Sequence, residues 1–151
     1  MISQSIIPIE ELVRHSYDMS LLDAVTSENN KGLEAIAEVK LTNPFLDDRR
    51  VPSWLCIEYM AQTIAAWAGS QARKEGREIG LGFLVGTRKF KANFEYIPLG
   101  TVLHISVKKE LYNETGISVF SSFVTSGAMK ATANINVFQP ANLADFLDSN
   151  S

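Results

Sequence analysis

The chain contains a single cysteine, two histidines and no long uninterrupted apolar run. Cys56 stands alone among 151 residues, so no disulfide can form within the chain, and we expect a reducing compartment, the cytoplasm. No stretch approaches the roughly 20 apolar residues of a membrane span, and MISQSIIPIEEL lacks the features of a signal peptide, so no membrane association is expected. The cysteine and histidines are far apart in sequence, so neither a metal nor a cofactor is predicted.

The charge balance shows no basic surplus. Fourteen basic and 17 acidic residues leave a net charge of −3, which gives no reason to expect nucleic-acid binding. A hydrophobic fraction of 46% is ordinary for a globular chain. With no internal repeat and no linker, we expect one domain over residues 1–151.

The middle of the sequence predicts one long helix, from Val51–Pro52 to about Glu75. Proline at the first helical position and glycine just past the end, here Gly76, are common helix boundaries. The first half of this helix is apolar nearly all round, so it should be enclosed by protein. The second half, SQARKEGRE, is polar and should reach water.

Two strand-like stretches precede this helix and four follow it. The later runs are GLGFLVGTRKFKANF, TVLHISVKKELY, GISVFSSFVTS and AMKATANINVF, and the turn residues between them indicate an antiparallel meander. A single apolar helix must be covered on most sides by the sheet. We therefore predict an α+β fold in the hotdog arrangement, an antiparallel sheet wrapped around one long central helix. Its edge strands favour a dimer, either a homodimer or a heterodimer with another hotdog subunit.

Glu58 is out of place in the apolar helix segment PSWLCIEYMAQTIAAWAG. Its neighbours one turn away are apolar apart from Gln62 at i+4, so Glu58 and Gln62 form a narrow polar stripe. We expect Glu58 to be buried, and burial favours the protonated carboxyl, which can donate a proton. Catalysis is the favoured interpretation; a structural hydrogen bond from Glu58 to strand backbone is the alternative.

Three segments resemble the bacterial hotdog 3-hydroxyacyl-(acyl carrier protein) dehydratases. VPSWLCIEYMAQ is similar to the family's central-helix motif, RHSYDMSLLDAV to its N-terminal segment, and GFLVGTRKFKANFEYIPLGTVLHISV to a strand pair. The likeness spans roughly residues 12–110. This sequence is more similar to the dehydratase-like proteins of aryl polyene biosynthesis clusters, whose central helix ends in the same Ala-Trp-Ala-Gly pattern.

The resemblance implies dehydration of a 3-hydroxyacyl thioester carried on acyl carrier protein. A histidine removes the proton beside the thioester, the helix carboxylate helps remove the hydroxyl group as water, and amides at the helix start polarise the thioester oxygen. Glu58 matches the carboxylate. Pro44 occupies the place of the motif histidine and Ser53 that of a glycine. We therefore predict His15, which aligns with the family's N-terminal histidine, as the base, with Asp47 or Asp48 as weaker alternatives.

The remaining predicted site residues concern binding. Gln62, Ser53, Trp54 and Phe83 are the predicted substrate-binding residues. Trp54 and Phe83, with Trp67, suit a tunnel for an aryl group, although three aromatic residues in a core are usually only packing residues. Two basic clusters, Arg73, Lys74 and Arg77 with Arg88, Lys89 and Lys91, suit an acidic carrier protein, although an ordinary solvated face has the same composition.

Two other functions fit the same sequence. In a hotdog acyl thioesterase, Glu58 would activate water without a histidine. In a non-catalytic partner subunit, the chain would pair with an active hotdog dehydratase, and the missing motif histidine motivates this alternative.

Overall fold

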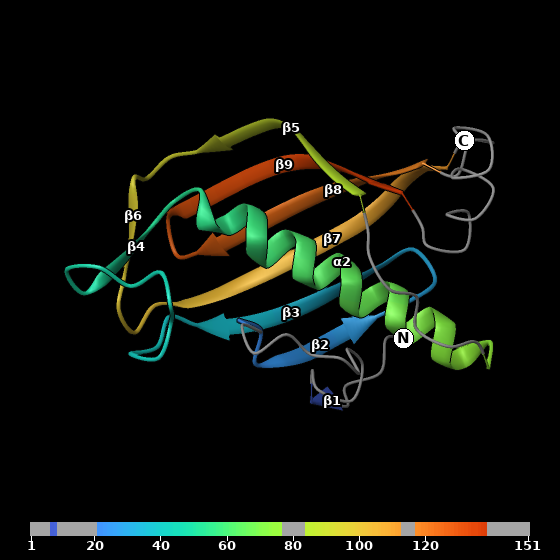
Figure 1. Ribbon diagram of the computed structural model, residues 1–151, viewed down its shortest axis with the longest axis horizontal. Coiled ribbons are helices and arrows are strands. Elements are labelled where there is room, and N and C mark those ends of the chain that lie inside the picture. The colour runs from blue at the N-terminus through green and yellow to red at the C-terminus, as the bar shows by residue number, and fades with distance from the viewer. Residues whose placement is uncertain (1–6, 9–20, 77–83, 113–116, 139–151) are drawn as a thin grey trace, which may run out of the picture.

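One long helix lies against one face of a curved antiparallel sheet in the computed structural model of the chain (Figure 1). The structure describes residues 7–8, 21–76, 84–112 and 117–138. The sheet has seven strands in the order β1-β2-β3-β7-β8-β9-β5, and β4 and β6 form a second, two-stranded sheet. The bounds are β1 Ile7–Pro8, β2 Ala24–Glu28, β3 Gly32–Glu38, β4 Arg50–Pro52, α2 Leu55–Lys74, β5 Leu84–Ala92, β6 Tyr96–Pro98, β7 Val102–Tyr112, β8 Ile117–Ser126 and β9 Met129–Phe138.

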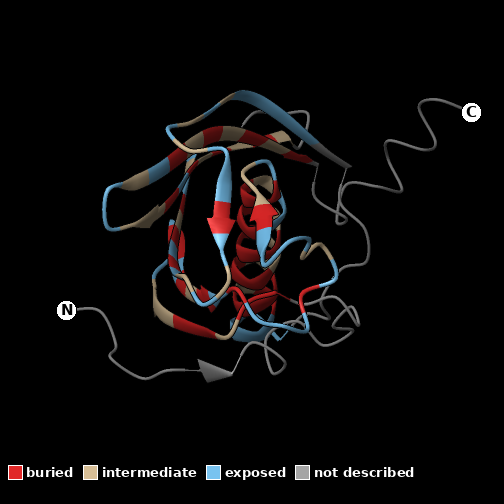
Figure 2. Cartoon of the chain, turned by 90° about the vertical axis from the view of Figure 1, so that its left-hand side faces the viewer, coloured by how far each residue is buried: buried red, intermediate tan, exposed pale blue. Residues whose placement is uncertain are grey.

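Alternation along the strands determines which face of the sheet covers α2. In β7, Leu103, Ile105 and Val107 are at most 2% exposed, whereas His104 and Lys108 at alternate positions are exposed, as period-2 geometry requires. Figure 2 shows buried and exposed stretches alternating along the strands that lie beside the helix. The predicted hotdog arrangement, with the sheet wrapped around one helix, is confirmed.

The predicted meander holds for three of the four strands after the helix. β7, β8 and β9 pair in sequence order, but β5 pairs with β9 at the far edge of the sheet rather than with β7. The chain passes from β5 to β7 through β6, which pairs with β4 instead of joining the large sheet. This small sheet escaped the prediction because each of its strands has only three residues.

The helix begins later than its proline suggested. Pro52 is the last residue of β4 and pairs with Tyr96, and α2 starts at Leu55 after a turn. A proline is compatible with this pairing because a two-stranded sheet has only edge strands. The predicted end is confirmed: Gly76 has φ +70°, and its N–H donates to the Arg73 carbonyl at 3.2 Å. Within the described segments, no helix is long and apolar enough to cross a membrane.

Candidate active site

Trp54 at the N-cap of α2 lies in line with Glu58 and Gln62 on the helix, because residues four apart share a helix face. Their exposure falls along the stripe: Trp54 is 52% exposed, Glu58 is exposed, and Gln62 is only 7% exposed. The stripe therefore runs from the surface at the helix start into the interior one turn beyond the carboxylate.

The predicted burial of Glu58 is wrong for the single chain. Its neighbours Leu55 and Tyr59 are 0% exposed, yet the Glu58 side chain is open to solvent. The sheet covers one side of α2, and Glu58 lies on the side that the sheet leaves open. Apolar neighbours in sequence indicated a buried helix, but they did not reveal how far around it the sheet extends.

Gln62 links Glu58 to the segment that precedes β2. Its Oε1 accepts a hydrogen bond from the Leu21 backbone N–H at 2.8 Å, and its Nε2 donates to Glu58 Oε1 at 3.1 Å. Sequence reasoning paired Glu58 with Gln62 through the i, i+4 spacing. It did not identify Leu21, since a contact through a backbone amide leaves no mark in the residue type.

The segment from Leu21 to Asp23 is fixed to the sheet as well as to the helix. Asp23 Oδ2 accepts the Glu38 N–H at 2.7 Å, and its other oxygen is ion-paired with Lys40. The Asp23 N–H donates to the Ile36 carbonyl at 2.9 Å. These bonds hold the chain at Leu21 in a defined place beside Gln62.

At the start of α2, two aromatic rings lie beside backbone N–H groups, some of which already donate hydrogen bonds within the protein. The Trp54 ring meets the Phe45 ring edge-on, with centroids 5.8 Å apart. The Cys56 and Ile57 amides donate to the Ser53 and Trp54 carbonyls at 3.0 Å, so two amides of the first turn already have acceptors. The Ser53 amide donates to the Glu95 carbonyl at 2.9 Å, which ties the helix start to the residue before β6.

The place of the family's motif histidine offers no base. Pro44 is exposed and has no titratable group. The adjacent Asn43 is buried; its Oδ1 accepts the Phe45 N–H at 2.8 Å, and its Nδ2 lies 3.4 Å from the Tyr59 hydroxyl. The Asn43 carboxamide, just before Pro44, therefore holds the loop in place through these hydrogen bonds.

Two buried titratable groups, Cys56 and Tyr59, lie on the side of α2 that packs into the core, which we call its sealed side. Burial raises the pKa of the Cys56 thiol from 9.0 to about 12, so the nucleophilic thiolate is absent at neutral pH. Burial, with a smaller contribution from nearby Cys56, also raises the pKa of Tyr59 to about 12, against the lowering effect of its hydrogen bond with Asn43. Both residues act as packing groups.

The other predicted residues are distributed as follows. His15 and Phe83 lie outside the described residues, so their predicted roles stay predictions. The chain's other histidine, His104, is not among the predicted site residues; it is exposed on β7, on the face of the sheet opposite the core. Asp47 and Asp48 are exposed. The backbones of Asp47 and Arg50 exchange two hydrogen bonds across a tight turn, as in an antiparallel strand pair. In the described part of the chain, no group of three His, Cys, Asp or Glu side chains is placed to hold a metal.

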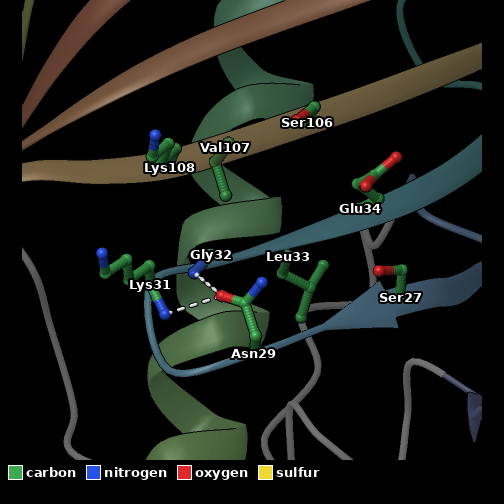
Figure 3. A pocket seen from close by; sticks show the side chains of 9 residues that line it. All are labelled: Ser27, Asn29, Lys31, Gly32, Leu33, Glu34, Ser106, Val107 and Lys108. Carbon is green, nitrogen blue, oxygen red and sulfur yellow. Dashed lines mark hydrogen bonds between the residues drawn. The ribbon is translucent and has the colours of Figure 1, made fainter. Parts of the chain in front are cut away.

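A separate hollow of about 340 Å³ lies between the β2–β3 turn and β7 (Figure 3). Glycine at position 32 is required there, because a Cβ would lie 2.1 Å from the Val107 carbonyl oxygen. Most of the lining is polar, which does not suit an acyl chain. The lining residues are Ser27, Asn29, Lys31, Gly32, Leu33, Glu34, Ser106, Val107 and Lys108. None of the predicted site residues is among them.

Solved structures share this architecture. The dehydratase heterocomplex ApeI:P from Xenorhabdus doucetiae contains a chain that superposes with a TM-score of 0.82 at 23% identity, covering 93% of this chain and 97% of that one. A sigma28-regulated virulence protein from Campylobacter jejuni superposes with a TM-score of 0.58 at 12% identity, covering 85% and 83%. At these identities the likeness establishes the fold.

The comparison of sequences assigns the family. A search of curated proteins found no match. The family model described as ApeP dehydratase, in contrast, matches residues 7–148, nearly the whole chain. The resemblance to the hotdog dehydratases of aryl polyene clusters is therefore confirmed, and the chain belongs to the ApeP-like dehydratase family.

Proposed function

We propose that this chain takes part in the dehydration of 3-hydroxyacyl thioesters carried on acyl carrier protein, in aryl polyene synthesis. The observation that carries the proposal is Glu58: a carboxylate on the open side of the central helix, held by Gln62, in a member of a dehydratase family. A carboxyl group that a substrate can reach is suited to proton transfer.

The reaction needs one base and one acid. The base, which we propose is His15, removes a proton from the carbon beside the thioester carbonyl. The electron pair of that C–H bond forms the new double bond as the C3–O bond breaks. Glu58 gives its proton to the departing hydroxyl group, so that water leaves and a 2,3-unsaturated thioester remains. His15 lies six positions before Leu21 in the sequence and outside the described residues, so its place beside Glu58 is part of the proposal.

The open position of Glu58 supports a second subunit. Glu58 is exposed, and the exclusion of water strengthens the electrostatic interactions of a proton donor with its substrate, so an acid at this position needs a cover. The structurally similar ApeI:P protein is a dehydratase heterocomplex, which favours another hotdog subunit as the cover, although a second copy of this chain is the alternative.

We place substrate binding at the helix start. Trp54 is exposed one turn before Glu58 and contacts Phe45, so its ring is available to an aryl or conjugated acyl group. Ser53, in the same turn, and Phe83 complete the proposed binding residues. Arg88, Lys89 and Lys91 are exposed on β5 and form the surface that we propose for an acidic carrier protein.

The test is loss of one water from a 3-hydroxyacyl carrier protein, followed by intact mass. Wild type, Glu58→Gln and His15→Ala are measured with and without the partner dehydratase subunit, and Glu110→Gln, an exposed glutamate on β7, is the matched control. We expect Glu58→Gln and His15→Ala to lose about 10²–10⁴-fold in rate while Glu110→Gln keeps wild-type activity. Full activity in His15→Ala would remove His15 as the base.

The same experiment tests a non-catalytic partner role, which Pro44 in place of the motif histidine favours. In that case the chain alone is inactive, the mixture is active, and Glu58→Gln in this chain leaves the activity of the mixture unchanged. Release of free thiol instead of water would identify a thioesterase.

A further inference from the structure

We propose that Gln62 is a positioning residue that fixes which oxygen of Glu58 carries the acid proton and couples that orientation to the segment at Leu21. The proposal rests on the proposed function, because it concerns how Glu58 acts. It differs from the predicted substrate-binding role of Gln62, since it places the amide in contact with protein groups at both ends.

The orientation of the Gln62 carboxamide follows from its partners. A backbone N–H can only donate a hydrogen bond, so the Gln62 atom 2.8 Å from the Leu21 nitrogen must be the carbonyl oxygen Oε1. The other end of the carboxamide is then the NH₂ group, which can only donate. That end lies 3.1 Å from Glu58 Oε1.

This orientation determines how Glu58 can be protonated. Gln62 donates to Glu58 Oε1, and the carbonyl oxygen of a carboxylic acid is a better acceptor than its hydroxyl oxygen, so this hydrogen bond favours Oε1 as the carbonyl oxygen. The proton of the neutral acid is therefore on Oε2, the oxygen that remains for the departing hydroxyl group. After transfer, the carboxylate still accepts the Gln62 hydrogen bond, so the side chain need not rotate during the reaction.

The Leu21 contact makes this orientation depend on the segment from Leu21 to Asp23. Gln62 is only 7% exposed and Leu21 only 8%, so water competes little for their hydrogen bond. Asp23 holds the same segment to β3 through the Glu38 amide. Without the Leu21 amide, the carboxamide could turn over and present its oxygen to Glu58, which would repel the ionised carboxylate.

Three variants separate the two hydrogen bonds. Gln62→Met removes both bonds and keeps the volume of the side chain. Gln62→Glu keeps an acceptor for the Leu21 amide but has no N–H to donate to Glu58. The double variant Glu58→Gln/Gln62→Glu restores the pair in the reverse sense and moves the carboxylate by one helical turn.

The first measurement is kcat and KM for dehydration by the assembled complex. We expect both single variants to lose at least about 10-fold in kcat, with KM changed less than about threefold, because a positioning residue does not touch substrate. We expect the double variant to fold like wild type and to remain inactive. A large rise in KM at unchanged kcat would overturn the proposal and identify Gln62 as a substrate ligand. Wild-type kcat in Gln62→Glu would also overturn it.

The second measurement does not depend on activity. Hydrogen exchange of the Leu21 amide should be at least about 10-fold faster in Gln62→Met and unchanged in Gln62→Glu. Equal exchange in all three proteins would overturn the coupling to the segment from Leu21 to Asp23. If wild type lacks activity in every assembly, the proposed function fails, whereas a loss of Leu21 protection confined to Gln62→Met still supports the hydrogen-bond coupling.

Discussion

The two sides of α2 differ more than its sequence suggests. On the side facing the sheet, Leu55, Tyr59, Met60 and Ala66 are 0% exposed and pack into the core. On the other side, Trp54 and Glu58 are exposed, and Ile57, Ala61, Ala65 and Ala68 are partly exposed. The first side stabilises the fold, and the second is available to substrate and partner. Substitutions on the sealed side should therefore change stability, and substitutions on the open side should change function.

The largest expected difference in stability is between alanine variants of Met60 and Glu58, which lie two residues apart on α2. Met60→Ala leaves a cavity in the sealed side and should lower the free energy of unfolding by about 2–5 kcal/mol. Glu58→Ala removes an exposed side chain with one hydrogen bond from Gln62 and should cost about 1 kcal/mol or less. Urea denaturation of the two variants measures the difference. Equal losses would show that Glu58 is as important for the core as Met60.

A second pair uses adjacent alanines with the same substitution. Ala66 is 0% exposed, so Ala66→Leu overpacks the interface with the sheet and should cost about 1–3 kcal/mol. Ala65 is partly exposed on the open side, so Ala65→Leu should stay within about 0.5 kcal/mol in the isolated chain. Thermal unfolding compares them. If Ala65→Leu also prevents association with a partner subunit, the open side is part of that interface.

The third prediction uses pH to test how tightly the sealed side is closed. Burial raises the folded-state pKa of Cys56 from 9.0 and of Tyr59 from 10.0, each to about 12, so the folded chain keeps protons that the unfolded chain releases. Stability is full below about pH 9 and should fall as pH rises toward 12, by up to about 1.4 kcal/mol per pH unit for each group.

Cys56→Ala and Tyr59→Phe supply the controls for that pH dependence. In each variant the free energy of unfolding should fall less steeply between pH 9 and 12 than in wild type, because the variant lacks one of the two titrating groups. Chemical denaturation measures this slope independently of the variant's stability at neutral pH. A slope that is unchanged in both would mean that water reaches these side chains.

The smallest effect on stability is expected at the exposed C-terminal end of α2. The Lys74 ammonium lies 3.4 Å from Glu28, but its side chain is 54% exposed, so Lys74→Ala should cost less than about 1 kcal/mol. Ser70 is buried and donates a hydrogen bond to the same carboxylate, so Ser70→Ala should cost about 1–3 kcal/mol. Denaturation in low and high salt distinguishes them, because only the loss from Lys74→Ala should shrink with added salt.

Much of the fold follows from local pattern. The alternation of apolar and polar residues in β7 accounts for the burial of Leu103, Ile105 and Val107 and the exposure of His104, because side chains of a strand alternate between its two faces. The end of α2 at Gly76 was also predictable, since a glycine accepts the positive φ that ends a helix. Such features depend on neighbouring residues only.

Errors arose where distant segments compete. Pro52 fits the first turn of a helix and equally fits an edge strand, and pairing with Tyr96 decided in favour of β4. β5 was expected beside β7, but the pairing of β6 with β4 separates them and leaves β5 at the outer edge beside β9. Neither outcome is visible within a window of ten residues.

The candidate site shows the same division. The sequence by itself determined that a carboxylate and a carboxamide share one face of a largely apolar helix, because the spacing of Glu58 and Gln62 fixes their side on any α-helix. Only the tertiary structure decided that this face is open at Glu58 and buried at Gln62, and that the Leu21 amide orients Gln62. Both outcomes depend on the position of the sheet edge and of a segment 41 residues away in the sequence.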